Sequence, residues 1–442
     1  FILRIEDTDQ GRLVEGATDV IYRTMAECGL THDEGPDVGG PVGPYIQSER
    51  RDLYQPYAHL LVEKGAAYYC FCEKAASEED AGDFDRADDP CRDLSPEEAR
   101  QRVEAGEPYV IRQRIPHEGT TTFHDVSFGD ITVENKTLDD QVLLKRDGLP
   151  TYNFANVVDD HLMGITHVVR GSEYLSSAPK YNLLYEAFGW EVPTYVHCSP
   201  VMRDQHNKMS KRHGDPSYED LKAQGFLTDA ILNYVALLGW APKGEYAEQE
   251  IFSLDELVKV FDIAGISKSP AIFDIEKLTY FNATYLRAME PAAFAEVAEP
   301  YIRQVVKNPA IDAAGIAALL QARCEKLTDI PEKVDFFDAL PDYDVEFFTN
   351  KKSKTNAEVS KAMLEAAIPA LEAISDWTVD AIHDTLIDLA AKLEVKNATL
   401  MWPVRIAAAG KLVTPGGAVE ICHLLGKDET LRRLRLGLDK LN

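Results

Sequence analysis

The spacing of apolar residues divides the chain into a front part that mixes strands with helices and a back part that is helical. Strand-like runs occupy residues 1–5, 108–115 and 194–202, and helical spacing occupies residues 17–29 and 177–190. The first run leads straight into a cluster of carboxylates. We therefore expect a buried strand whose carboxyl end presents acidic side chains at the edge of a site.

Two further patterns locate a hairpin and the start of the helical part. Asp147 and Gly148 separate two apolar runs, which is a strong signal for a tight hairpin. From residue 289 the chain is rich in alanine and leucine, and Ile382, Leu386 and Leu389 fall on one face of a helix. The back part is therefore predicted to be a bundle of amphipathic helices.

These patterns predict an α/β domain with an insertion, followed by helical domains. The alternation of strand-like and helical segments ends at residue 49 and resumes at residue 151. A small mixed α+β segment lies between these two parts. The predicted domain ranges are 1–49 with 151–205 for the α/β domain, 50–150 for the insertion, 206–288 for a basic loop with helices, and 289–442 for two helical sub-bundles.

Composition restricts the compartment and the class of partner. The net charge of −28 argues against a protein that coats nucleic acid without regard to sequence, but local basic faces could still bind one. No apolar run has the length of a membrane span. The seven cysteines are scattered, which is typical of a reducing compartment, so we expect a cytoplasmic protein without a membrane partner.

The segment NKMSKRHGD carries the most specific chemistry. Its lysines Lys208 and Lys211, with Arg212 and the hydroxyl of Ser210, suit a polyphosphate whose charge moves during a reaction. The order Lys-Met-Ser-Lys resembles the signature loop of class I aminoacyl-tRNA synthetases. In that family the lysines neutralise the pyrophosphate that leaves ATP.

Other stretches agree with this resemblance along the whole chain. FILRIEDTD, DEGPDVGGPVGPYIQSER, the long run from GLPTYNFANVVDDH to LLYEAFG, and SKSPAIFD all resemble glutamyl-tRNA synthetases of the bacterial type. The resemblance implies a Rossmann-type catalytic domain, an inserted acceptor-stem-binding domain, a helical stem-contact domain and an all-α anticodon-binding domain. It also implies a glutamate–tRNA ligase that uses L-glutamate, ATP with Mg²⁺ and tRNA(Glu), and we expect a monomer.

The resemblance also assigns roles to single residues. It implies that Lys208, Ser210 and Lys211 are catalytic and that, with Met209, they bind ATP. Glu173 would lie near the ribose, and the backbone of Val201 would meet adenine. The residues implied for glutamate are Glu6, Tyr152, Asn156 and Arg170.

The chemistry of the glutamate residues supports these roles. A guanidinium such as that of Arg170 can bind a carboxylate through two hydrogen bonds, and a carboxylate such as Glu6 can hold an ammonium group. Tyr152 and Asn156 are four residues apart, so they share a face if this segment is helical.

The predicted contacts with tRNA lie at both ends of the chain. The resemblance implies that Asp9 lies near the 3′ end of tRNA. It also implies that Arg405, Thr414, Pro415 and Gly416 touch anticodon bases. The family continues this last motif with two bulkier apolar residues where this chain has Gly417 and Ala418.

Two sets of side chains have the chemistry of metal ligands. The run Asp159-Asp160-His161 lacks the spacing of a known ligand set, so a structural role is favoured. The other set resembles a zinc site that some family members carry. Its members are Cys70, Cys72 and Cys91, but the family's fourth position is Ala87 here, so thiols without metal are favoured.

Two alternatives stay open at the level of sequence. A glutaminyl-tRNA synthetase would read Asp-Asp-Thr-Asn in place of Glu-Asp-Thr-Asp and would end in β-barrels. A catalytically inactive tRNA-binding relative would lack the HIGH motif, which is not among these 442 residues. If the chain belongs to an active enzyme, about thirty residues containing HxGH are expected before Phe1.

Overall fold

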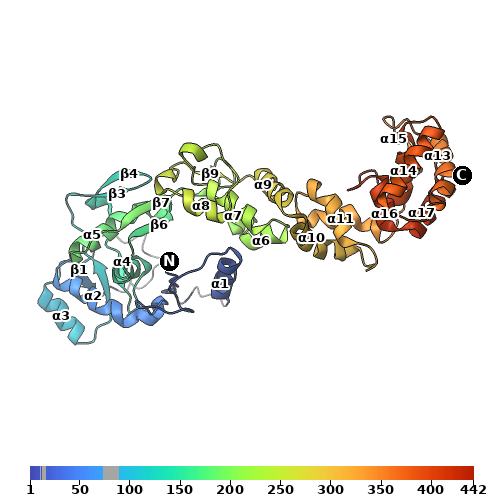
Figure 1. The fold of residues 1–442 in the computed structure, drawn as a ribbon. Coiled ribbons are helices and arrows are strands. Elements are labelled where there is room, and N and C mark those ends of the chain that lie inside the picture. Colours follow the sequence, from blue (N-terminus) through green and yellow to red (C-terminus); the bar gives the residue numbers. More distant parts are fainter. Residues whose placement is uncertain (10, 12–15, 73–88) are drawn as a thin grey trace. The chain divides into compact units, whose positions relative to one another are not determined.

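A computed structural model describes residues 1–9, 11, 16–72 and 89–442. The chain forms two compact units, which are described separately (Figure 1). The first, called the α/β unit, comprises residues 1–215 and 235–273, and the second, called the helical unit, comprises residues 216–234 and 274–442. None of the helices in the described ranges is long and apolar enough to cross a membrane.

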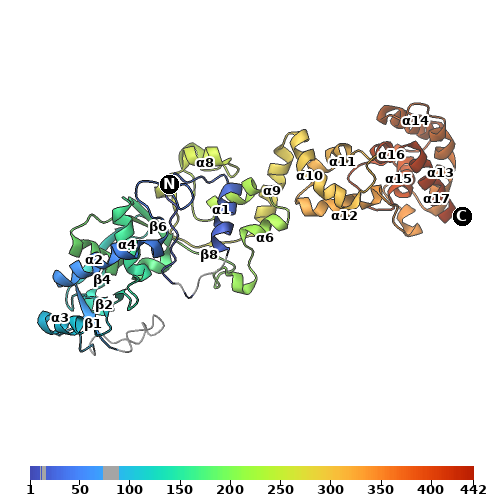
Figure 2. The same cartoon turned by 90° about the horizontal axis from the view of Figure 1, so that it is seen from below.

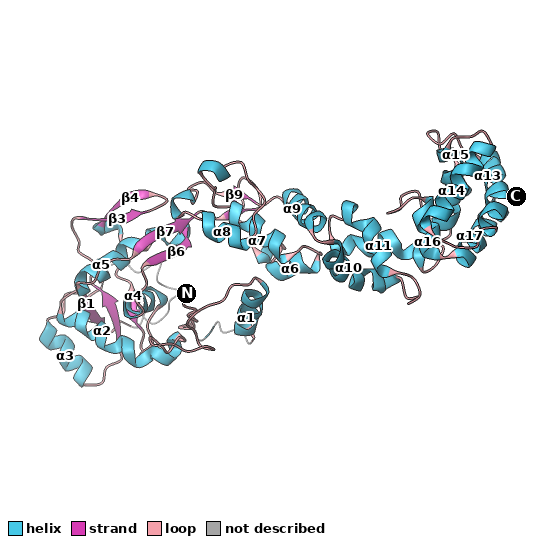
Figure 3. Cartoon of the chain, viewed as in Figure 1, coloured by secondary structure: helices cyan, strands magenta, loops and turns pink. Residues whose placement is uncertain are grey.

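The described residues of the α/β unit form three small sheets, whose strands are drawn as arrows in Figure 3. One sheet has the strand order β4-β3-β7-β6, in which β3, β7 and β6 run parallel and β4 is antiparallel to β3. A second has the order β1-β2-β5, and β8 pairs with β9. The strands are β1 (Ala67–Cys70), β2 (Val110–Gln113), β3 (Thr120–Asp125), β4 (Gly129–Glu134), β5 (Val142–Leu144), β6 (His167–Gly171), β7 (Thr194–Cys198), β8 (Val201–Met202) and β9 (Ala271–Ile272).

The parallel strands explain where a site can form. Because β3, β7 and β6 point the same way, their carboxyl ends meet at one edge of the sheet, which is where ligands bind in open α/β folds. The helices that start within the α/β unit are α1 (Ala17–Glu27), α2 (Arg51–Glu63), α3 (Pro96–Glu104), α4 (Tyr152–Leu162), α5 (Ala178–Phe188) and α8 (Leu254–Val260).

The segment predicted as an insertion contributes to two sheets. Its strands β1, β2 and β5 form their own sheet, and Asp147-Gly148 makes the predicted turn, with Lys145 N–H donating to the carbonyl of Leu149 at 2.8 Å. However, β3 and β4 lie within the same predicted range, and β3 pairs with β7. One sheet of the α/β unit therefore includes β3 and β4, which the sequence pattern assigns to the insertion.

The expected buried strand at residues 1–5 is wrong. Within the described residues, Ile2 makes an isolated bridge with Glu34, and Ile5 makes another with Ile46. Leu3 and Ile5 N–H groups donate to the carbonyls of Glu34 and Tyr45 at 2.8 Å each. Because the two bridges use two separate segments, the hydrogen bonds fix the position of this stretch without building a strand ladder.

The helical unit is built as predicted from amphipathic helices (Figure 2). Helix α7 (Thr228–Leu237) crosses the boundary between the units. The other helices are α6 (Tyr218–Ala223), α9 (Ile275–Ala288), α10 (Pro291–Val305), α11 (Ala313–Leu320), α12 (Ile330–Val334), α13 (Ala357–Glu372), α14 (Val379–Lys392), α15 (Asn397–Ala409), α16 (Ala418–Leu425) and α17 (Lys427–Lys440).

Two groups of helices share one apolar core in this unit. Helices α10, α11 and α12 pack together, and α13 to α17 pack together. Ile382 and Leu386, on the predicted face of α14, are fully buried in that core.

Arg433 is a fully buried cation in the helical unit. Its guanidinium donates to the carbonyl oxygens of Phe336 at 2.7 Å and Ala408 at 2.8 Å, and it pairs with Glu429 at 2.6 Å. The neighbouring Arg432 also pairs with Glu429, but its side chain is exposed. The two arginines therefore form a matched pair that differs in burial.

We expect Arg433→Met to lower the free energy of unfolding of the helical unit by about 3 kcal/mol, because two buried carbonyls lose their donor. Arg432→Met is expected to change it by less than about 0.5 kcal/mol, since exposed ion pairs contribute little. Thermal and urea unfolding followed by circular dichroism measure both effects. Equal losses from the two variants would contradict this role of Arg433.

Candidate functional site

Three polar side chains lie at the carboxyl ends of the three parallel strands. Arg170 is on β6, His197 is on β7, and Asp125 ends β3. The Nε of Arg170 donates to Nε2 of His197 at 3.2 Å, and Nδ1 of His197 lies 2.6 Å from Oδ2 of Asp125. Sequence reasoning identifies Arg170 but misses the other two, because neither belongs to a recognisable motif.

The guanidinium of Arg170 has a buried donor that is available to an anion. Its Nη2 is buried and has no hydrogen-bond partner in the described part of the chain. The rings of Tyr174, Tyr181 and Tyr195 surround the guanidinium, with centroids at 5.2, 4.7 and 5.5 Å from Cζ. A buried guanidinium nitrogen without an acceptor is costly unless a ligand supplies one, so the geometry favours a carboxylate here.

Helix α4 brings Tyr152 and Asn156 to the same region. The helical spacing predicted for them is confirmed, since both lie on one face of α4. The amide of Asn156 is buried, and it interacts with the hydroxyl groups of Tyr152 and Tyr181. The ring of Tyr152 lies 5.5 Å from that of Tyr174. Burial raises the pKa of Tyr152, and the nearby carboxylate of Glu6 adds to this, so its hydroxyl stays protonated and can donate.

Glu6 is held in place by Arg4, which sequence reasoning does not single out. Nη2 of Arg4 donates to Oε1 of Glu6 at 2.8 Å, and Nη1 donates to Oδ1 of Asp160 at 2.9 Å. Burial works to lower the pKa of Arg4, but the carboxylates of Asp160 and Glu6 outweigh it and raise that pKa. The result is a partly exposed carboxylate, fixed near Tyr152, that can accept from an ammonium group.

Asp159 and Asp160 belong to the run for which a structural role is predicted. Asp159 is fully buried and accepts hydrogen bonds from Gln47 at 2.9 Å, Arg50 at 2.7 Å and Tyr54 at 2.7 Å. Asp160 pairs with Arg4. Both carboxylates are therefore engaged by neighbouring side chains that stabilise the fold around the site.

The signature loop follows β8 directly. Met209 N–H donates to the carbonyl of Val201 at 3.1 Å, which joins the loop to the strand predicted to meet adenine. Ser210 N–H donates to Oδ2 of Asp215 at 2.7 Å, and this closes the loop. Lys208 and Lys211 are exposed. The Nζ of Lys208 is 3.6 Å from Oε1 of Glu173, so the residues predicted for ATP lie in one neighbourhood.

A cluster of thiols lies beside the β1-β2-β5 sheet. The Sγ atoms of Cys72 and Cys91 are 3.6 Å apart, and those of Cys70 and Cys72 are each 3.8 Å from Oδ1 of Asp89. The prediction that no fourth ligand stands near is wrong, because Asp89 supplies one. Ala87, the position that the family pattern indicates, lies outside the described residues.

A tight turn explains why Asp89 reaches the thiols. Arg92 N–H donates to the carbonyl of Asp89 at 3.2 Å, and Cys91 N–H donates to Oδ1 of Asp89 at 2.9 Å. The four ligand atoms lie within 4.8 Å of one another. A tetrahedral Zn²⁺ with Zn–S bonds of about 2.3 Å requires ligand atoms about 3.8 Å apart, so this set fits zinc.

In the helical unit the predicted tRNA residues form one local cluster. Nη1 of Arg405, on α15, donates to Oγ1 of Thr414 at 2.8 Å, and Thr414 donates to the carbonyl of Gly416 at 2.8 Å. Pro415 is buried between them. Asp9 belongs to the α/β unit, where Oδ1 accepts from Gly11 N–H at 3.2 Å.

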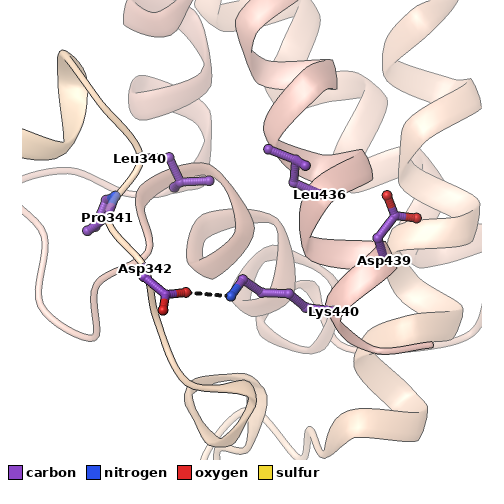
Figure 4. A pocket seen from close by; sticks show the side chains of 6 residues that line it. All are labelled: Leu340, Pro341, Asp342, Leu436, Asp439 and Lys440. Carbon is purple, nitrogen blue, oxygen red and sulfur yellow. Dashed lines mark hydrogen bonds and ion pairs between the residues drawn. The ribbon is translucent and has the colours of Figure 1, made fainter.

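A surface pocket on the helical unit lies apart from these predicted residues (Figure 4). Lys440 and Asp342, which both line this pocket, form an ion pair at 2.7 Å. Its lining consists of Leu340, Pro341, Asp342, Leu436, Asp439 and Lys440. None of these residues carries a predicted function.

Two family profiles match the chain and together span most of it. The profile described as "tRNA synthetases class I (E and Q), catalytic domain" matches residues 1–280. The profile described as "Anticodon binding domain" matches residues 293–438.

Curated proteins and solved structures agree with these profiles. Proteins named glutamate–tRNA ligase from Clostridium botulinum (strain Hall) and Clostridium tetani are 56% and 55% identical to the chain, covering all of it and 91% of their own lengths. The crystal structure of a glutamate tRNA ligase from Elizabethkingia meningosepticum in complex with its amino acid matches with a TM-score of 0.88 at 32% identity. That match covers 100% of this chain and 93% of the other.

Proposed function

The chain belongs to the glutamate–tRNA ligases, a family of class I aminoacyl-tRNA synthetases, and on that premise we propose how its residues divide the work. The enzyme joins glutamate to tRNA at the expense of ATP. The observation that supports the division best is the buried Nη2 of Arg170, which has no partner among the described residues and complements a carboxylate.

Glutamate is held by hydrogen-bond donors at a carboxylate and by an acceptor at its ammonium group. Arg170 and the amide of Asn156 donate to one carboxylate of the substrate, and the hydroxyl of Tyr152 adds a donor from the same face of α4. Glu6 accepts from the α-ammonium group. The arrangement therefore complements one carboxylate and the ammonium group of the substrate.

Adenylate formation needs positioning and charge stabilisation, and no side-chain nucleophile. The α-carboxylate oxygen of glutamate attacks the α-phosphorus of ATP, the P–O bond to the β-phosphate breaks, and pyrophosphate leaves with the electron pair. Lys208, Ser210 and Lys211 stabilise the charge that gathers on the pyrophosphate. Glu173 and the backbone of Val201 hold the nucleoside, and Mg²⁺ enters with ATP as its counter-ion.

The second step transfers the glutamyl group to tRNA. The 2′-hydroxyl of the terminal adenosine attacks the carbonyl carbon of the adenylate, and AMP leaves as the proton of the hydroxyl is lost. Asp9, in the α/β unit, is assigned to the 3′ end of tRNA. Arg405, Thr414, Pro415 and Gly416 are assigned to the anticodon of tRNA(Glu).

Aminoacylation assays distinguish the glutamate–tRNA ligase from a glutaminyl-tRNA synthetase and from an inactive tRNA-binding relative. The complete protein should attach labelled glutamate to tRNA(Glu) and should not attach glutamine to tRNA(Gln). Charging with glutamine would support the glutaminyl-tRNA synthetase alternative. Binding of tRNA without any charging would support an inactive relative.

We also propose that Cys70, Cys72, Asp89 and Cys91 hold a structural zinc ion. Three thiolates and a carboxylate at these separations form a closed tetrahedral set, which would fix the turn of residues 89–92 against β1. The Phe71 N–H group donates to Sγ of Cys91 at 3.3 Å, which ties this ligand to the end of β1. The ion would stabilise this part of the fold and would take no part in the reaction.

The purified protein is expected to contain about one zinc ion per chain, because the four ligands complete its coordination. Metal analysis and the absorption of a cobalt-substituted sample measure occupancy and thiolate ligation. Cys72→Ser should lose the metal, whereas Cys28→Ser, at a buried cysteine outside the cluster, should keep it. Zinc content near zero in the unmodified protein, with no cobalt–thiolate absorption, would overturn the proposal.

A further inference from the structure

We propose that His197 and Asp125 are positioning residues that set the orientation of Arg170 for the carboxylate of glutamate. The inference rests on the proposed function, because it assigns Arg170 to that carboxylate. It adds a hydrogen-bonded chain, Asp125–His197–Arg170, whose first two members do not touch the substrate.

The strand register brings the three side chains together. Arg170 on β6 lies directly opposite His197 on β7, and β3, which ends at Asp125, pairs with β7 on its other side. Asp125 and His197 are fully buried, and they are 72 residues apart in the sequence. The chain therefore runs across the edge of the sheet, from one parallel strand to the next.

The hydrogen bonds of Asp125 fix which nitrogen of His197 carries the proton. Oδ1 of Asp125 accepts from the N–H groups of Ser127 at 2.9 Å and Phe128 at 2.8 Å. Oδ2 accepts from the N–H group of His197 at 3.0 Å and faces Nδ1 of the same residue at 2.6 Å. Because Nε–H of Arg170 can only donate to Nε2 of His197, Nδ1 is the protonated nitrogen and donates to Oδ2 of Asp125.

The other ring nitrogen is then an acceptor for Arg170. With its proton on Nδ1, the ring offers the lone pair of Nε2 to Nε–H of Arg170 at 3.2 Å. Burial lowers the pKa of His197 and outweighs the hydrogen bond to Asp125, which acts to raise it. The ring is therefore neutral at neutral pH. A protonated ring would lose this acceptor and place a second cation beside Arg170.

This bond determines which donors of Arg170 face the substrate. Because Nε is occupied by His197, the Nη groups remain for the ligand, and Nη2 is the buried nitrogen without a partner in the described chain. The rings of Tyr174, Tyr181 and Tyr195 restrain the plane of the guanidinium from other sides.

Two substitutions separate positioning from a general structural role. His197→Gln can place an amide oxygen near the position of Nε2, and so keep an acceptor for Arg170. His197→Asn can place its amide near Nδ1 and keep the bond to Asp125, but it offers no acceptor at the Nε2 position. In the complete protein with tRNA(Glu), we expect His197→Asn to raise the KM for glutamate roughly 10- to 100-fold. His197→Gln should reverse most of that rise in the KM for glutamate. The KM for ATP should stay within about twofold of the value for the unmodified enzyme in both variants.

A double variant tests whether the effect passes through Arg170. In an Arg170→Gln background, His197→Asn should raise the KM for glutamate less than about twofold further, because the residue it positions is gone. An unchanged KM for glutamate in His197→Asn, or equal losses in both single variants together with equal changes in KM for ATP, would overturn the proposal. Additive effects in the double variant would do the same. If the unmodified enzyme shows no glutamate-dependent ATP–pyrophosphate exchange, the proposed function fails instead, so the two failures are distinguishable.

Discussion

Replacing Lys211 by alanine in the complete protein is expected to slow glutamate-dependent ATP–pyrophosphate exchange by roughly 10²- to 10³-fold. Lys211 is exposed on the loop that follows β8, and in our account its ammonium group stabilises charge that appears only as pyrophosphate leaves. The loss should therefore fall on kcat, with a small change in the KM for glutamate. Exchange of labelled pyrophosphate into ATP, measured with tRNA(Glu) present, gives both parameters.

Binding of tRNA provides the internal comparison for this variant. The dissociation constant of tRNA(Glu) should change by less than about threefold, since one exposed cation contributes little to a large interface. Lys259→Ala removes a matched exposed lysine from α8 and should leave exchange unaffected. Equal losses of exchange and tRNA binding in Lys211→Ala would sink the assignment of this residue to the leaving group.

Arg170→Gln is expected to raise the KM for glutamate by roughly 10²- to 10³-fold, equivalent to about 3–4 kcal/mol. Glutamine retains hydrogen-bonding capacity but removes the charge and the paired donors that face the substrate carboxylate. The KM for ATP should stay within about twofold, because the nucleotide is assigned to Glu173, Val201 and the signature loop. Steady-state exchange kinetics at varied glutamate and ATP measure the two constants separately.

The control for Arg170 is an arginine with no assigned role. Arg100→Gln removes an exposed cation from α3, whose partners are the exposed carboxylates Glu97 and Glu104, and it should leave both KM values unchanged. If Arg170→Gln raised the KM for ATP as much as that for glutamate, Arg170 would not be specific to the amino acid.

Local patterns in the sequence predict the parts of the site that are close together in the chain. Lys208 to Lys211 form one loop, and the order of these residues is sufficient to indicate their chemistry. Tyr152 and Asn156 share a face of α4 because their spacing is that of one helical turn. Arg405 and the Thr414–Gly416 loop are likewise neighbours in sequence and are joined by a hydrogen bond.

Features that depend on long-range pairing could not be predicted. His197 reaches Arg170 through the register of two parallel strands, and Asp125 comes from a third strand that sequence texture assigns to an insertion. Asp89 joins the thiols through a tight turn, which ligand spacing alone does not show. Residues 1–5 have the pattern of a strand, but only two isolated bridges hold them among the described residues.

We propose that one set of residues recognises glutamate and that a separate loop promotes the departure of pyrophosphate. The most direct test measures the KM for glutamate and the kcat of ATP–pyrophosphate exchange for the complete protein, Arg170→Gln and Lys211→Ala in one experiment. We expect Arg170→Gln to change mainly the KM for glutamate and Lys211→Ala to change mainly kcat. If both variants changed the same parameter to the same extent, the division between the two sets of residues would be contradicted.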